Sequence, residues 1–205
     1  HLQASEEQRS AMETLGSVSQ TATMRTMARV VGRAAASSSA DIVDQPLVEL
    51  RAVDAAWPLV GEMETGNGVE TSAFTAPAAD GNWIAVAQPI LFERLGLSPG
   101  DKVAVGNIEV VLEDSLTVEP DTLSTGLRFA PRLLLSSDAL EAAGLVRGGS
   151  LVTWSYALAL NEAGTAEQAQ AEIEGAFPNA GWRVQTTDWT SPQLAHAEQR
   201  NSDVL

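Results

Sequence analysis

The sequence contains no cysteine and only two histidines among its 205 residues. Without cysteine the chain has no disulfide, no thiolate metal site and no thiol nucleophile, although this absence does not decide between cytosol and periplasm. His196 lies in a polar C-terminal segment close to Glu198, and a lone histidine on a polar helix face is usually solvated. The sequence therefore gives little support to cysteine or histidine chemistry.

Basic residues and long apolar runs are also scarce. Lys and Arg number 12 against 27 Asp and Glu, which gives a formal net charge of −15. This charge repels nucleic-acid backbones and anionic membrane surfaces, so neither is expected as a partner. Apolar runs such as Leu133–Leu135 fall far short of the roughly 20 residues that cross a bilayer. Because the chain starts at His1 without a signal peptide, we expect a soluble piece of a longer protein.

The stretch from Trp83 to Leu145 is predicted to form a compact, barrel-like unit. In it, short strands and two short helices, Pro89–Leu95 and one that ends at Gly144, alternate with Gly and Pro turns. Strands this short cannot bury both faces in an open layer, so they are expected to curl into a closed shape. With 44% hydrophobic residues, two small cores fit the pattern better than one large core.

The flanking segments are predicted to form a porter-like module of the split β-α-β type, with helices on one face of an antiparallel sheet. Capping boxes at Ser5 and Thr165 each start a helix, and alternating apolar residues indicate strands. The predicted elements are a helix from Ser5, a long or bent strand over 17–31, a hairpin tip at 34–40, strands at Leu47–Val53 and Ser150–Leu160, a helix from Thr165, a strand at Trp182–Thr187 and a helix from Ser191.

The predicted fold class is therefore α+β, with a small, mostly β module inserted into the porter-like module. The porter-like module is predicted to comprise residues 1–57 and 149–205, and the inserted module residues 58–148. Within the insert, residues 62–82 are rich in Gly, Thr, Ala and acidic side chains. They are predicted to form a long excursion with little regular structure.

Two pairs of carboxylates are candidates for metal binding or acid–base chemistry, Glu113 with Asp114 and Glu119 with Asp121. A structural role is favoured for the second pair, because Pro120 fixes a turn and Asp121 can accept local backbone hydrogen bonds. The sequence has no calcium-loop spacing, no phosphate loop and no nucleophile elbow. We therefore expect no catalytic residue, no metal and no cofactor.

Other residues are interpreted as structural or interaction positions. Gly100 is expected to take a positive φ in the turn after Pro99, and Asp101 to cap that turn. Arg132 is expected to pair with Glu119 or Asp121 at the surface, which would stabilise the fold by about 1 kcal/mol or less. The full set of candidate positions is Arg51, Trp57, Pro58, Gly100, Asp101, Glu119, Pro120, Asp121 and Arg132.

Several motifs together carry a resemblance to a known family. They are Leu50–Gly61 (LRAVDAAWPLVG), Leu91–Gly106, Glu119–Asp121, Ala130–Arg132 and Gly144–Ser150. In this order they resemble the first extracytoplasmic domain of MacB/FtsX-like ABC transporter permeases, in the lysophospholipase-associated or predicted lipoprotein-export branch. Arg51 replaces the family's usual lysine and Trp57 its usual tyrosine, so charge and aromatic bulk are kept.

The resemblance implies a role without bond-making chemistry. In such permeases this domain lies outside the cytoplasmic membrane, between the first and second transmembrane helices, while a separate cytoplasmic subunit hydrolyses ATP. The implied partners are therefore the transmembrane helices of the same chain, that ATPase subunit, and a periplasmic protein or lipoprotein cargo. The implied function is to couple ATP hydrolysis to movement of this partner or cargo.

Two alternatives stay open. The first is an independent ligand-binding module, in which a groove between the two modules holds a lipid or small solute; an apolar cavity at their junction would favour it. The second, less favoured, is a metal- or carboxylate-dependent hydrolase that relies on Glu119 or Asp121.

Overall fold

The computed structural model describes residues 3–32, 45–74, 81–120, 130–161 and 165–186. Their fold is α+β, as predicted, and no helix in these ranges has the length and apolar character needed to cross a membrane. The elements in chain order are α1 (Glu6–Leu15), β1 (Gly16–Val30), β2 (Leu47–Val53), β3 (Glu64–Thr65), the 3-10 helix η2 (Thr71–Phe74), β4 (Trp83–Ala87), α2 (Pro89–Leu95), β5 (Lys102–Val105), β6 (Ile108–Val118), β7 (Arg132–Ser136), α3 (Ser137–Ala143), β8 (Thr153–Leu160) and α4 (Ala166–Ala176).

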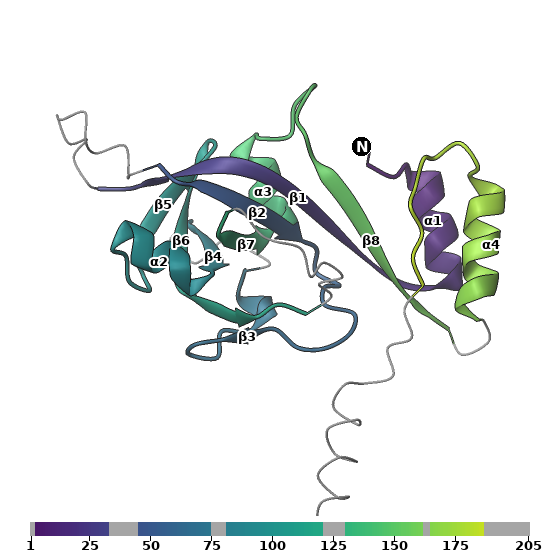
Figure 1. The fold of residues 1–205 in the computed structure, drawn as a ribbon, viewed down its shortest axis with the longest axis horizontal. Coiled ribbons are helices and arrows are strands. Elements are labelled where there is room, and N and C mark those ends of the chain that lie inside the picture. Colours follow the sequence, from purple (N-terminus) through teal and green to yellow (C-terminus); the bar gives the residue numbers. More distant parts are fainter. Residues whose placement is uncertain (1–2, 33–44, 75–80, 121–129, 162–164, 187–205) are drawn as a thin grey trace, which may run out of the picture.

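The strands β1, β2, β7, β4, β6 and β5 form a closed barrel at one end of the molecule (Figure 1). Neighbouring strands in this order are hydrogen-bonded, and β5 pairs back onto β1. The predicted barrel is therefore present, but the stretch 83–145 does not close it alone. The strands β1 and β2, which were assigned to the porter-like module, complete it, because β2 pairs with β7 and β1 pairs with β5.

The 15-residue strand β1 serves both ends of the molecule. Its residues 16–23 pair with β8, residues 21–27 with β2, and residues 28–30 with β5. The predicted strand over 17–31 is thus confirmed as one continuous element. It runs from the two helices α1 and α4 into the barrel (Figure 1).

The barrel interior is filled by alternating strand residues and by the two short helices. In β2, Val48, Leu50 and Ala52 face the core, as the predicted alternation requires. The helix α2 contributes Leu91, Phe92 and Leu95, and α3 contributes Ala139 and Leu140. These residues are therefore buried because closure of the sheet gives them a common interior.

The outer face of the barrel at β2 and β7 is also covered. Leu134 packs there in a second cluster with Val53, Trp57, Val86 and Leu116. Its neighbours Leu133 and Leu135 point into the barrel interior. Burial on both faces explains why β7 carries an uninterrupted apolar run instead of an alternating pattern.

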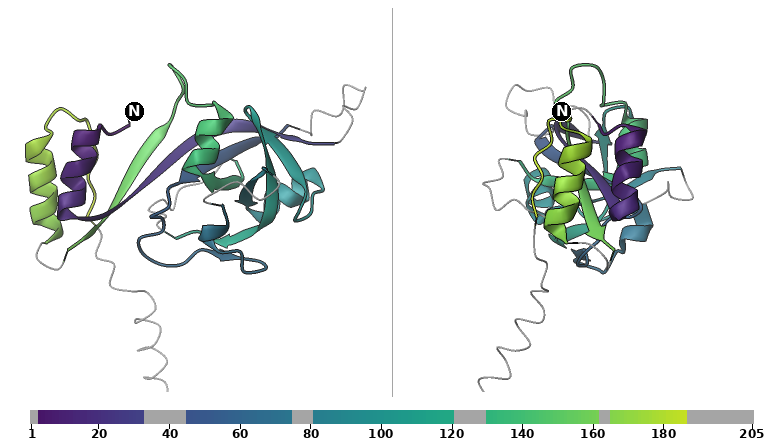
Figure 2. Two further views of the ribbon diagram at one scale, coloured as in Figure 1. Left: turned by 180° about the vertical axis from the view of Figure 1, so that it is seen from behind. Right: turned by 90° about the vertical axis from the view of Figure 1, so that its right-hand side faces the viewer.

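The helices α1 and α4 lie side by side at the other end, beside the ribbon formed by β1 and β8 (Figure 2). Met12, Val18 and Ile173 are the buried residues of their small core. Both predicted capping boxes are present: the hydroxyls of Ser5 and Thr165 accept hydrogen bonds from the backbone N–H of Gln8 and Gln168. The helix pair therefore has its own apolar contacts, separate from the barrel core.

The predicted strand at Trp182–Thr187 is wrong for its described part, residues 182–186, which has no regular structure. Trp182 packs against the ring of Phe177, with 5.8 Å between the ring centroids, and belongs to the helix-pair core. We infer that side-chain packing, not strand pairing, holds this segment. The predicted hairpin tip at 34–40 and the helix from Ser191 lie outside the described residues. The excursion over 62–82 has only β3 and η2 as regular elements in its described part.

Candidate functional site

Four charged side chains meet on the outer face of the barrel, three of them buried and the fourth, Glu49, 22% exposed. Arg51 Nη1 lies 2.7 Å from Glu119 Oε1, and Arg132 Nε lies 3.2 Å from Glu119 Oε2. Arg132 Nη1 also lies 3.2 Å from Glu49 Oε1. We call these four residues the arginine cluster; it brings together three of the predicted candidate positions and adds Glu49.

The strand register places these side chains together. Glu49 lies opposite Arg132 in the parallel β2–β7 pair, and alternation puts Arg51 on the same face as Glu49. Trp57, only 2% exposed, covers Arg51, whose guanidinium carbon lies 5.7 Å from the centre of the indole ring. This arrangement is a cation–π contact inside a desolvated site.

The predicted pairing of Arg132 with Glu119 is confirmed, but its predicted place at the surface is wrong. The side chains of Arg132 and Glu119 are 5% and 6% exposed. Burial of a charge is costly unless it is paired, and two guanidinium groups here balance two carboxylates. Because Glu119 is enclosed by two arginines, it is not placed to act as a general base for a hydrolase.

The predicted turn before β5 is confirmed. Gly100 has a φ of +95°, and its backbone N–H donates to the carbonyl of Leu112 over 2.8 Å. The carboxylate of Asp101 accepts a hydrogen bond from the N–H of Ser98, also over 2.8 Å. These residues therefore fix the entry into β5.

Two of the remaining candidate positions are described: Pro58 follows β2, and Pro120 follows β6. The peptide bond between Trp57 and Pro58 is cis. Pro120 lies against Gly61: a Cβ added at Gly61 would lie 3.2 Å from that of Pro120. Asp121, like His196, falls outside the described residues.

The side chains of the candidate pair Glu113 and Asp114 point to opposite faces of β6. Glu113 is exposed, whereas Asp114 is 1% exposed and accepts hydrogen bonds from the backbone N–H groups of Asn67 and Ser115 and from the Asn67 amide. Burial raises the pKa of Asp114, but these hydrogen bonds outweigh it and hold the pKa below its ordinary value. Asp114 therefore fastens the excursion after β3 to the barrel.

Replacing Asp114 with asparagine is expected to lower the free energy of unfolding at neutral pH by about 1–3 kcal/mol, because an amide N–H₂ would then face N–H donors. Since the pKa of Asp114 is lowered on folding, its carboxylate stabilises the fold above the unfolded-state pKa. This contribution is lost as the pH falls through the lower folded-state pKa. Urea unfolding of wild type and D114N from about pH 7 to about pH 3 measures it.

The difference between wild type and D114N should shrink in acid, and a constant difference would contradict the role given to the carboxylate. The exposed Glu109 on the same strand provides the control, because E109Q should change stability by no more than about 0.5 kcal/mol.

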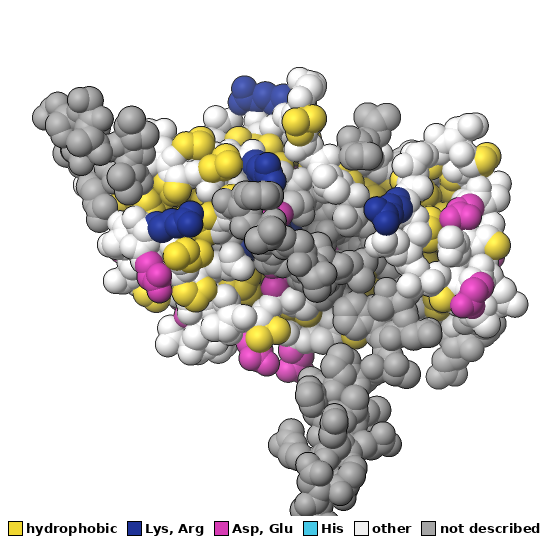
Figure 3. All heavy atoms as spheres, in the orientation of Figure 1, with side chains coloured by type: hydrophobic (Ala, Val, Ile, Leu, Met, Phe, Trp, Pro, Cys, Tyr) yellow, Lys and Arg dark blue, Asp and Glu magenta, His cyan; other side chains and the backbone are white. Residues whose placement is uncertain are grey.

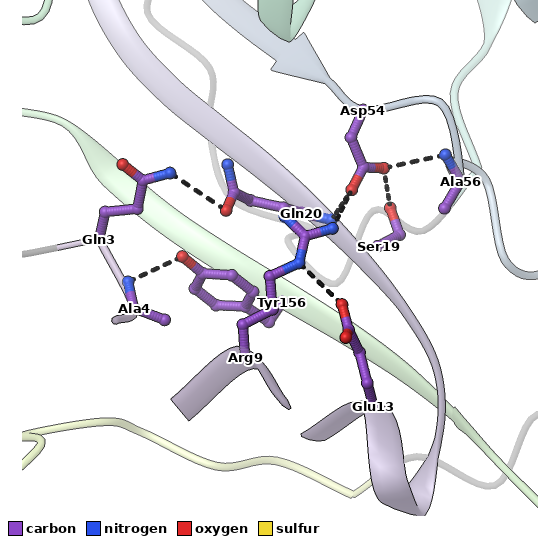
Figure 4. A network of polar contacts seen from close by, with 9 residues as sticks. All are labelled: Gln3, Ala4, Arg9, Glu13, Ser19, Gln20, Asp54, Ala56 and Tyr156. Atoms are coloured by element: carbon purple, nitrogen blue, oxygen red, sulfur yellow. Dashed lines mark hydrogen bonds and ion pairs between the residues drawn. The ribbon is translucent and has the colours of Figure 1, made fainter. Parts of the chain in front are cut away.

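Asp54, which the sequence did not single out, is the centre of a second polar network (Figure 4). Its carboxylate accepts hydrogen bonds from the N–H of Gln20 over 2.7 Å, the hydroxyl of Ser19 over 3.0 Å and the N–H of Ala56 over 3.2 Å. Arg9 Nη2 of α1 lies 3.9 Å from the same carboxylate. The available signal was an Asp directly after a strand, a position where this residue often caps a turn.

The described residues line two hollows. An apolar one of about 360 Å³ lies between β8, α4 and the segment after β2, with Leu59, Leu160 and Ile173 among its walls. A more polar one of about 450 Å³ lies between α3, β8 and the N-terminal segment, next to Gln3 and Trp154. On the face shown in Figure 3, Lys and Arg side chains lie apart from one another. In the described ranges no group of three or more His, Asp or Glu side chains is placed to bind a metal ion.

Comparison with known proteins gives one sequence relative and a shared fold, while no protein-family model matches. The chain is 30% identical over 117 residues to the ABC transporter permease YbbP of Escherichia coli (strain K12). This match covers 57% of the chain and 13% of YbbP, so the chain corresponds to a small part of that relative.

The extracellular domain of the noncanonic ABC-type transporter YknZ from Gram-positive bacteria superposes with a TM-score of 0.55 at 13% identity, covering 88% of this chain and 86% of that domain. A permease-protein domain from Porphyromonas gingivalis gives a TM-score of 0.48 at 12% identity, covering 85% and 80%. The YknZ likeness concerns the fold, and the YbbP match concerns the sequence. The chain therefore resembles a part of one ABC transporter permease in sequence and shares its fold with the extracellular domain of another ABC-type transporter.

Proposed function

We propose that the chain is a non-catalytic domain of a MacB/FtsX-like permease, in the lipoprotein-export branch, at the extracytoplasmic face of the bacterial cytoplasmic membrane. Transmembrane helices of the same protein would precede and follow it, and a separate cytoplasmic subunit would hydrolyse ATP. The sequence match to YbbP and the fold shared with the YknZ domain support this proposal.

The domain would transmit movement between the membrane and a periplasmic partner or lipid-modified cargo. The observation that carries this idea is β1, which joins the helix pair to the barrel at the other end of the molecule (Figure 1). ATP-driven movement of the transmembrane helices would shift the helix pair, and the barrel would follow. Such a transmission requires different contacts in two states.

We retain the predicted division of the chain as part of this proposal. Residues 58–148 supply β4, β5, β6 and β7 of the barrel, while residues 1–57 and 149–205 supply the helix pair, β8, β1 and β2. The moving parts would not follow this division strictly, because β1 and β2 complete the barrel.

Replacing residues 3–186 with a short Gly/Ser linker in the whole permease, assembled with its ATPase subunit, tests the coupling role. We expect cargo release to be lost and ATP hydrolysis to stop responding to cargo, since the linker cannot transmit a directed force. The measurements are ATPase rate and cargo release in reconstituted membranes. Co-purification of the ATPase subunit controls for assembly, and unimpaired release by an assembled complex would refute the proposal.

The apolar hollow of about 360 Å³ favours a second candidate, an independent module that binds a lipid or small solute. Its walls come from β8, α4, the segment after β2 and residues 184–186. A bound lipid would therefore contact both the helix pair and the segment after β2. Titration of the isolated chain with a lysophospholipid tests this second candidate, because it requires saturable binding and an absence of binding would contradict it.

A further inference from the structure

The ribbon of β1 and β8 gains a third strand, β2, at one point along its length. Residues 16–20 of β1 pair only with β8 among the described strands, whereas residues 21–23 are held by both β8 and β2. A two-stranded ribbon twists more and is less stable than a sheet of three or more strands. The transition therefore falls at Gln20, opposite Tyr156 of β8.

The polar hollow of about 450 Å³ lies at this transition. It separates Gln3, which precedes α1, from Asp138 and Glu141 of α3 in the barrel, and its wall includes Gln20. Close packing in a protein interior resists relative motion, and this hollow is a gap in that packing. The space between the helix pair and the barrel thus leaves room for bending of the ribbon.

Asp54 joins the parts on both sides of the transition. Its backbone N–H donates to the carbonyl of Gln20 over 3.2 Å, and its carboxylate accepts from the N–H of Gln20 and the hydroxyl of Ser19. The same carboxylate faces Arg9 of α1 (Figure 4). One side chain at the end of β2 therefore contacts the barrel edge, the two-stranded part of β1 and the helix pair.

We propose that Ser19–Gln20 of β1 and Tyr156–Ala157 of β8 form a hinge between the helix pair and the barrel, and that Asp54 locks it. The lock is the set of bonds to Asp54: while they are made, Ser19 and Gln20 are held to the end of β2. When the bonds to the Asp54 carboxylate are lost, Ser19 and Gln20 keep the ribbon ladder to β8 and the backbone bond from the N–H of Asp54 to the carbonyl of Gln20. The role of this hinge in coupling rests on the proposed function. Its geometry rests on the contacts of Asp54 and the strand pairing alone.

The cysteine-free sequence allows a direct test with spin labels on introduced cysteines in the full 205-residue chain. One label pair spans the hinge, at the exposed Glu172 of α4 and the exposed Glu109 of β6. A second pair lies within the barrel, at the exposed Glu93 of α2 and the exposed Glu113 of β6. Double electron–electron resonance then measures the distribution of distances between the two labels of each pair, in wild type and in Asp54→Ala.

The proposal expects Asp54→Ala to broaden the distribution across the hinge, or to add a second distance, and to leave the distribution within the barrel unchanged. An unchanged distribution across the hinge would overturn it. So would broadening of both pairs, because Asp54 would then support the barrel itself. Glu13→Ala, which removes the other partner of Arg9, is the matched control and should change neither pair.

Asp54→Asn keeps the shape of the side chain and provides the same test if Asp54→Ala does not fold. It should broaden the same distribution, since it removes the charge that faces Arg9 and replaces one acceptor oxygen with a donor. The measurement needs no membrane, ATPase or cargo. Its failure therefore leaves the coupling role standing, and failure of the linker experiment leaves the hinge standing.

Discussion

Replacement of Glu119 with glutamine is expected to lower the free energy of unfolding by about 3–5 kcal/mol, the cost of breaking a buried ion pair by neutralising one partner. Glutamine keeps the size of the side chain but removes the charge. Arg51 and Arg132 then each lose an ion pair with Glu119, whose N···O distances are 2.7 Å and 3.2 Å. Urea denaturation, with the midpoint and slope fitted together, measures the loss.

The exposed Glu113 on β6 gives the matched control, because E113Q makes the same chemical change in water and should shift stability by no more than about 0.5 kcal/mol. A loss below about 1 kcal/mol in E119Q would instead match an exposed ion pair. That result would contradict the burial of the arginine cluster under Trp57.

Truncation of Leu134 to alanine is expected to cost about 2–5 kcal/mol, from lost apolar burial and from the cavity that remains. Leu134 is fully buried, although it points away from the barrel interior. Its partners Trp57 and Leu116 come from distant parts of the chain, so the surroundings have little freedom to collapse into the space.

Leu151, which is 91% exposed, is the control for this truncation, since L151A should stay within about 0.5 kcal/mol of wild type. Thermal and urea unfolding of both variants gives the comparison. A small loss for L134A would mean that the outer face of β7 is open to water, against the cluster around Trp57.

Local features of the sequence carried much of the prediction. The two capping boxes place the starts of α1 and α4, and Pro89 with Gly96 brackets α2. The alternation in β2 correctly separates Val48, Leu50 and Ala52, which face the core, from Glu49 and Arg51. These signals succeed because each depends on residues a few positions apart, whose geometry is set within one turn or one strand.

Errors arose where distant segments decide the outcome. The pattern of β1 indicates a strand, yet it does not specify β2, β5 and β8 as its partners. The segment 182–186 has a strand-like pattern but forms no ladder, because Trp182 packs onto the helix pair. An alternating apolar pattern shows which face of a strand is buried. Which other segment covers that face depends on the fold of the whole chain.

Composition and local pattern alone predicted an acidic, cysteine-free α+β chain with two capped helices and a β-rich middle. Closure of the barrel by β1 and β2, burial of the arginine cluster and the Asp54 network needed the folded chain. The reason is distance along the sequence: Arg51 and Glu119 are 68 residues apart, and Glu49 and Arg132 are 83 apart. Contacts of that range exist only after the sheet has set its register, and the register fixes which charges share a dry interior.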